Sequence, residues 1–398
     1  MAASQFRGSR LAEMIGSLYV HVPLCLRMCD YCDFYSLPSS HPLRAEIVPL
    51  LLSELRLRQE SLERREAIEA KASIAWDTVY VGGGTPSVLS PEEIYELARG
   101  IGPLAPDGEW TVEANPEDLS PDWIDALASG GVNRLSLGIQ SLTDRLLKAV
   151  GRRGSRETAL RGLDLARARW KGRLSLDLIA GLPGQTEEDL ARDIAEALSF
   201  GPDHVSLYAL TVEKGTPLAG RFRTDEESSA RLWLAGRDAL EEAGLRQYEV
   251  SNFARPGSES RHNLVYWRMG SWLAVGPSAS GTEVSQDHAR RYRNACDLER
   301  WAIDPVGSAE TEDVSRLELV EETMMMGFRL RDGISRNRFR ARFGTDILNL
   351  IGPAASRWAD RGLLVADEGA VALTADGLAL LNLFLADCME CLWENEHR

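Results

Sequence analysis

Short segments of alternating apolar and polar residues, joined by helix-length connections, most constrain what this chain can fold into. They lie at residues 17–22, 77–83, 109–115, 134–140, 173–181, 204–210 and 247–253. Successive side chains of a strand point to opposite faces of a sheet, so each segment would have one apolar and one polar face. Helix-length connections favour right-handed strand–helix–strand units and parallel pairing. The sequence therefore predicts an α/β fold, an incomplete (open) parallel (βα) barrel.

The polar faces of these strands predict a cavity that holds a polar ligand. Glu113 and Asp177 alternate with apolar neighbours in the third and fifth segments. A well-packed barrel fills its interior with branched apolar side chains, and buried carboxylates without partners would be costly there. An antiparallel sheet with one wet face is the alternative, but it fits helix-length connections poorly.

Beyond about residue 255 the alternation of strands and helices fades. The chain ends in two helical stretches, the short strands GLLVAD and AVALT, and a final helix. We expect an N-terminal tail (1–16), the (βα) partial barrel (17–255), a connecting segment (256–302) and a smaller C-terminal helical, winged-helix-like domain (303–398). Because this last domain shows no basic recognition face, we expect it to pack or to bind a partner and not DNA.

Charge and hydropathy exclude several classes of function. Lys and Arg total 45 against 60 for Asp and Glu, a net charge of −15. Nucleic-acid backbones and anionic membranes repel such a chain, and no apolar stretch approaches the roughly 20 residues that span a bilayer. The first residues lack the apolar core of a signal peptide. We expect a cytoplasmic protein that binds no nucleic acid; peripheral membrane contact and a homodimer stay open.

One short loop after the first predicted strand carries clustered cysteines. Cys25, Cys29 and Cys32 have the spacing C-x3-C-x2-C. Clustered thiols in a reducing compartment more often bind metal or react than merely pack. Three thiolates on a [4Fe-4S] cluster would leave one iron open, whereas electron-transfer ferredoxins use four. Zinc, which usually takes a fourth Cys or His, and chance clustering are the alternatives.

The cysteine loop resembles the signature of radical S-adenosylmethionine (SAM) enzymes. Further stretches are similar to the oxygen-independent coproporphyrinogen III oxidase-like group of that superfamily: residues 82–87, 113–116, 131–140 and 176–185. The similarity runs from about residue 17 to about residue 385. It implies a [4Fe-4S] cluster on the three cysteines, with the amino and carboxylate groups of SAM on the fourth iron.

The resemblance also implies which residues contact SAM. Glycines after the second strand would let the backbone approach the methionine moiety. Polar residues near the ends of strands three to five would hold the methionine and ribose, two tyrosines would lie beside the cluster, and an arginine would contact a carboxylate. The set is Tyr19, Tyr31, Gly83, Gly84, Thr85, Glu113, Gln140, Arg152 and Asp177. Barrel active sites form at the carboxyl ends of strands, which agrees with this placement.

Within the group, two functions are candidates. One is the radical decarboxylation performed by coproporphyrinogen III oxidase; the other is that of HemW-type heme chaperones, which bind heme and pass it to respiratory hemoproteins. Phe34 stands where the oxidase pattern has a further cysteine, and only residues 1–16 precede the first strand, where the oxidase has a long extension. Residues 262–267 match the HNxxYW motif of the chaperones. The resemblance favours the chaperone, and we expect no oxidase activity.

The same motif implies the residues that contact heme. Neutral imidazole is a good iron ligand, so His262 would contact the iron, and Tyr266 and Trp267 would flank a porphyrin face. A histidine in a loop that caps the barrel is the alternative. Two histidines that the family often carries are absent, in residues 151–154 and 276–281, so we assign no proton-donating or second iron-binding role there.

Overall fold

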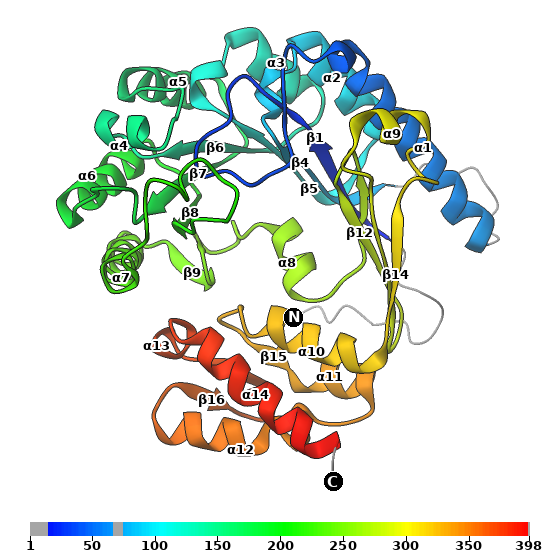
Figure 1. Cartoon of the computed structure of the whole chain (residues 1–398), viewed down its shortest axis with the longest axis vertical. Helices are drawn as coiled ribbons and strands as arrows, with labels where there is room; N and C mark the ends of the chain where they lie inside the picture. Colours follow the sequence, from blue (N-terminus) through cyan, green and yellow to red (C-terminus); the bar gives the residue numbers. More distant parts are fainter. Residues whose placement is uncertain (1–14, 67–74, 397–398) are drawn as a thin grey trace.

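The computed structural model describes residues 15–66 and 75–396. A nine-stranded sheet forms the larger part of the molecule (Figure 1). Its strands, in spatial order, are β11 (Leu273–Val275), β1 (Ser17–Val22), β4 (Trp76–Gly83), β5 (Leu104–Ala114), β6 (Arg134–Gln140), β7 (Arg173–Ala180), β8 (His204–Ala209), β10 (Asn252–Ala254) and β9 (Arg246–Glu249). Neighbours from β11 to β8 pair parallel. Because the described residues contain no pairing between β11 and β9, the predicted open parallel barrel is confirmed.

Helices connect the strands and cover the apolar face of the sheet. They are α1 (Ile47–Glu66), α2 (Pro91–Ile101), α3 (Pro121–Ser129), α4 (Asp144–Ala149), α5 (Arg156–Arg169), α6 (Glu187–Leu198) and α7 (Glu226–Glu242). Ser90 and Ser120 each accept a backbone N–H of the first helical turn, just before a proline, and this Ser-Pro pattern is typical of a helix start. Leu18, Val112 and Leu176 belong to the core between sheet and helices. In Figure 1 these helices lie around the outside of the sheet.

The other face of the sheet is polar. The strand register places Tyr19 beside Tyr80 and Glu113 beside Ser136. Ser136 Oγ in turn donates to Asp177 Oδ2 of the next strand at 3.2 Å. The alternation within each strand therefore produces the polar inner face that the sequence predicts.

The edges of the sheet differ from the expectation. Residues 247–253, expected as one strand, belong to the hairpin of β9 and β10. Strand β10 pairs antiparallel with both β8 and β9. A two-residue connection cannot join parallel strands, so the direction reverses there. At the opposite edge, β11 pairs parallel with β1. It comes from the segment 256–302, expected only as a connection, so the sheet continues beyond residue 255.

A second body follows the barrel. Helix α8 (Arg261–Trp267), the antiparallel strands β12 (Ser280–Val284), β13 (Ala289–Arg293) and β14 (Glu310–Val314), and α9 (Leu298–Ile303) lead to it. The C-terminal elements are α10 (Arg316–Gly327), β15 (Ile334–Ser335), α11 (Arg336–Phe343), α12 (Ile347–Asp360), β16 (Leu364–Ala366), β17 (Ala370–Leu373), α13 (Ala375–Leu378) and α14 (Leu381–Glu396). They enclose a core of their own that buries Cys388 and Cys391. Figure 1 shows α8 between this body and the sheet. None of the described helices could cross a membrane.

Candidate cluster site and adjoining aromatic pocket

The cysteine loop leaves the carboxyl end of β1. Strand β2 (Leu24–Cys25) pairs with β3 (Leu37–Pro38) and closes the loop at its base. Cys25 is buried there, while Cys29 and Cys32 are partly buried in the loop. Among the described residues, no three Cys, His, Asp or Glu side chains converge closely enough to hold a single metal ion. A [4Fe-4S] cluster does not need that closeness, because each thiolate binds a different iron.

The electrostatics of the thiols show that they are neighbours. Burial raises the pKa of the Cys32 thiol to about 11, and the nearby thiols of Cys29 and Cys25 add to the increase. Arg152 Nη1 donates to Cys29 Sγ at 3.7 Å, and Cys25 Sγ lies 3.4 Å from Thr85 Oγ1. The Cys32 thiol is therefore protonated near neutral pH, and iron binding would displace its proton. Three thiols on one loop beside a cation fit the donor set of a cluster.

The glycines after β4 allow a close approach to the cysteine loop. A Cβ on Gly84 would lie 2.6 Å from the Leu24 carbonyl oxygen, next to Cys25. Gly83 has φ +106°, and a Cβ there would lie 2.6 Å from Nδ1 of His21. These glycines therefore serve first to pack this turn against the base of the loop. The packing also brings Thr85 to Cys25.

Two carboxyl groups lie on the inner face of the sheet. Tyr80 Oη donates to Glu113 Oε1 at 2.6 Å. Burial raises the pKa of Glu113 to about 7; the Tyr80 hydrogen bond opposes this, and the nearby Asp177 adds to it. Burial likewise raises the pKa of Asp177. Two buried carboxyl groups on one face of the sheet would favour a cationic ligand, and SAM carries a sulfonium and an ammonium.

Other predicted SAM residues gather between the strand ends and the cluster loop. Gln140, at a bulge at the end of β6, has the left-handed φ of +66°. Strained non-glycine backbone of this kind is concentrated at functional sites. Arg152 Nη2 donates to Asn115 Oδ1 at 2.6 Å while Nη1 reaches Cys29, so it joins β5 to the loop. Tyr31 packs beside an apolar cluster, and burial raises its pKa.

His262 of the HNxxYW motif is enclosed by protein. It lies in α8, is 0% exposed, and both of its ring nitrogens have partners. Nδ1 is 2.8 Å from Thr78 Oγ1, and Nε2 is 2.7 Å from Tyr266 Oη. Burial lowers the pKa of the His262 imidazole to about 3, so it is neutral. Trp267 packs beneath the guanidinium of Arg329, 4.5 Å from the ring centroid.

A cavity of about 480 Å³ adjoins the cluster loop; we call it the aromatic pocket. It is bounded by β1, the cluster loop, α8, β12, β13 and α10. Its lining residues are Tyr19, His21, Asp33, Phe34, Tyr35, Tyr266, Trp267, Met269, Trp272, Ser278, Ala279, Ser280, Arg291, Arg293, Glu322 and Met326. Tyr19 of the SAM set thus shares a cavity with Tyr266 and Trp267 of the heme set.

The sequence analysis did not identify several residues of this pocket. Arg291 and Arg293 alternate along β13, so they lie on the same face of that strand. Arg291 Nη2 donates to Glu322 at 2.7 Å, whereas Arg293 has no carboxylate partner among the described residues. The basic run at 290–293 was the only sequence signal for them. Trp272 gave no signal, because its ring reaches the pocket through tertiary packing against Tyr266, 4.7 Å between centroids.

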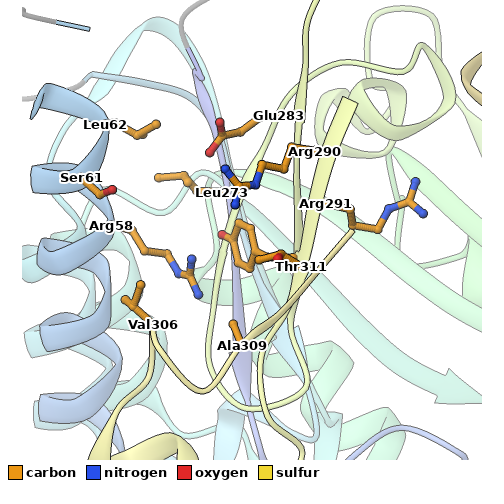
Figure 2. Close-up of a pocket in the computed structure, with 11 residues that line it drawn as sticks. Arg58, Ser61, Leu62, Leu273, Glu283, Arg290, Arg291, Val306, Ala309 and Thr311 are labelled. Carbon is orange, nitrogen blue, oxygen red and sulfur yellow. The ribbon is translucent and has the colours of Figure 1, made fainter. Parts of the chain in front are cut away.

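A second cavity, of about 270 Å³, lies between α1 and the strands β12 to β14 (Figure 2). None of the predicted site residues lines it. Arg58 stacks on Tyr292 at 3.7 Å and pairs with the buried Glu54 at 2.7 Å. In Figure 2 the guanidinium of Arg291 points away from Arg58 and Arg290. We therefore interpret the cavity as a gap left where α1 packs on the sheet of β12, β13 and β14, and not as a functional site.

Comparison with known proteins places the chain in a family. Residues 19–197 match the Radical SAM superfamily, and residues 314–380 match the HemN C-terminal domain. The chain is 33% identical to the heme chaperone HemW of Bacillus subtilis, over 92% of this chain and 97% of that protein. It belongs to the HemW group of radical SAM proteins. The family resemblance drawn from the sequence motifs is thereby confirmed.

Other comparisons agree with membership of the HemW group. The radical S-adenosyl methionine domain-containing protein 1, mitochondrial, of Bos taurus is 34% identical over 95% of this chain and 88% of that protein. The solved structure of coproporphyrinogen III oxidase (HemN) from Escherichia coli has a TM-score of 0.77, over 94% of this chain and 89% of that one, at 22% identity. At that identity the likeness shows the fold alone. The superfamily implies a [4Fe-4S] cluster and SAM as cofactors.

Proposed function

We propose that this protein is a heme chaperone that holds heme in the aromatic pocket, next to an iron–sulfur cluster. The observation that carries the proposal is that the HNxxYW helix and the cluster loop line one cavity. Tyr266 and Trp267 come from the helix, and Phe34 and Tyr35 come from the loop. The cavity volume lies within the roughly 300–1,000 Å³ that is typical of small-molecule sites. Flat aromatic side chains suit a porphyrin face.

The charged groups of the pocket support an anionic, planar ligand. Arginine binds carboxylates through two parallel hydrogen bonds, and heme carries two propionates. Arg293 is exposed. Its guanidinium donates to Ser278 Oγ at 3.4 Å, which is a long hydrogen bond to a neutral group. We therefore assign propionate recognition to Arg293, with Arg291 on the same face of β13.

The cofactors are proposed on the residues already described. Cys25, Cys29 and Cys32 would hold the [4Fe-4S] cluster, and Arg152 would balance its thiolate charge. Bound there, the cluster would supply one iron without a thiolate ligand, to which SAM could bind. Glu113 and Asp177 would face the positive charges of SAM from the inner face of the sheet. Tyr19, Tyr31, Gly83, Gly84, Thr85 and Gln140 complete the proposed contact set.

The physiological role follows from the relatives that are named heme chaperones. We propose that heme bound in the aromatic pocket is passed to respiratory hemoproteins, in the cytoplasm or at the membrane that encloses it. Phe34 lines the pocket and is 64% exposed, and Met28 of the same loop is also exposed. Exposed apolar side chains at the rim of a site commonly mark contact with a partner.

Heme titration of the anaerobically reconstituted protein tests the proposal. We expect saturable one-site binding in the Soret band, weakened at least about tenfold in Trp267→Ala. The matched control is Trp393→Ala, because Trp393 lies on α14, is 63% exposed and does not line the pocket. Wild-type protein without saturable binding would end the proposal. Incubation with SAM, dithionite and coproporphyrinogen III supplies the second arm: conversion to protoporphyrinogen would make the protein an oxidase instead.

A further inference from the structure

The hydrogen-bond network fixes the tautomer of His262. Thr78 Oγ1 donates its proton to Ser17 Oγ at 2.9 Å. Its lone pairs are then left to accept from His262, so the imidazole carries its proton on Nδ1. The lone pair of Nε2 consequently accepts the phenol proton of Tyr266, at 2.7 Å. Neither ring nitrogen is free for an iron atom.

The surroundings of His262 keep a ligand away from it. The side chain is 0% exposed, and its ring lies against Tyr80, 5.4 Å between centroids. On the other side Tyr266 meets it edge-on at 4.9 Å. Tyr266 lines the aromatic pocket, whereas His262 does not. A heme in the pocket would thus meet Tyr266 first.

We propose that Tyr266, and not His262, is the side chain that binds the iron of a ferric heme in the aromatic pocket. The inference rests on the proposed function, because it needs heme in that cavity. A tyrosine phenolate is an established type of heme ligand, and a hard anionic oxygen suits ferric iron. His262 then acts as a positioning residue that orients the phenol and receives its proton.

The binding step balances without any further reagent. The Fe–O bond forms as the O–H bond of Tyr266 breaks, and the proton moves to Nε2 of His262. The iron stays ferric throughout. In the protein without heme, burial keeps the His262 imidazole neutral; the negative charge formed on the Tyr266 oxygen 2.7 Å from Nε2 is what favours the protonated ring. The imidazolium then donates to the phenolate through Nε2 and to Thr78 Oγ1 through Nδ1, so both of its N–H groups have acceptors.

Tyr266→Phe separates the two possible ligands. The substitution removes only the phenol oxygen and leaves Nε2 of His262 with a free lone pair. If Tyr266 binds the iron, ferric heme affinity falls at least about tenfold, and the high-spin spectrum with phenolate-to-iron charge transfer disappears. If His262 binds the iron, Tyr266→Phe keeps or gains affinity for ferric heme. Wild type and variant then share the same imidazole-type spectrum. That second result would overturn the proposal.

Two further variants make the experiment decisive. His262→Gln retains an acceptor for the phenol, so we expect ferric heme still to bind, with a phenolate spectrum and a loss of affinity smaller than that of Tyr266→Phe. Tyr95→Phe, on the exposed face of α2, is the matched control and should titrate like wild type. Thermal unfolding of each variant checks that it folds. Wild-type protein that binds no heme refutes the proposed function, whereas binding unaffected by Tyr266→Phe refutes only this inference.

Discussion

Replacing Glu113 with Gln should stabilise the protein in the absence of SAM while weakening its SAM binding. The carboxyl group lies on the inner face of the sheet, where burial and the neighbouring Asp177 raise its pKa to about 7. Ionising it without a cationic partner is therefore unfavourable. Glutamine keeps an oxygen that accepts from Tyr80 Oη but has no charge to bury.

The size and sign of the effect follow from the pKa. In the unfolded chain the group titrates near 4.5, so the folded state binds its proton more tightly by about 2.5 pKa units. At about 1.36 kcal/mol per unit, this contributes roughly 3 kcal/mol of stability. The contribution is complete below pH ~4.5 and is lost as the pH rises towards 7. Glu113→Gln does not titrate, so its advantage over wild type should grow from near zero to about 3 kcal/mol.

Urea unfolding at several pH values between 5 and 8 measures this difference. Glu96→Gln, which removes an exposed carboxylate of α2, is the control and should show no such trend. A difference between Glu113→Gln and wild type that stays constant over this range would refute the reasoning. Calorimetry on the reconstituted protein should show SAM binding weakened at least about tenfold, because the variant cannot pair with the cation.

Three further outcomes are expected. A triple alanine variant of the cluster cysteines should lose the roughly four iron and four sulfide ions per chain of the anaerobic wild type, measured by chemical analysis. Glu54→Ala should destabilise the protein by about 3–5 kcal/mol in urea unfolding, because it leaves the buried Arg58 charge unpaired. Gly84→Ala should cost about 1–3 kcal/mol and slow cluster reconstitution, because its Cβ would collide with the Leu24 backbone.

Local sequence rules predicted the architecture of the barrel well. Connection lengths set the parallel direction, and the Ser-Pro pairs at Ser90 and Ser120 marked helix starts that the structure contains. Alternation within strands predicted which side chains face inward. Each of these signals depends only on residues that are near one another in the sequence, so a short segment is enough to predict the local structure.

The failures occur where long-range packing decides. The run 247–253 alternates like a single strand, and its turn at Val250 and Ser251 has neither glycine nor proline. Its reversal is set by β8, with which β10 pairs, and by the C-terminal core against which Val250 packs. Strand β11 has three residues and no alternation of apolar and polar side chains. Its partner β1 lies far away in the sequence, near the start of the chain.

In the HNxxYW motif, the spacing of residues predicts one contact of His262 but not the other. Residues four apart on a helix share a face, so the contact between His262 and Tyr266 was within reach of the sequence. The sequence instead favoured an imidazole that binds iron, because histidine is a good ligand whenever a nitrogen is free. What removes that freedom is Thr78, on β4, which takes up Nδ1 from a position 184 residues away. With Nδ1 bound by the barrel and Nε2 bound by Tyr266, the motif acts as a unit that presents a phenol to the pocket. Its histidine and tyrosine should therefore be tested as a pair.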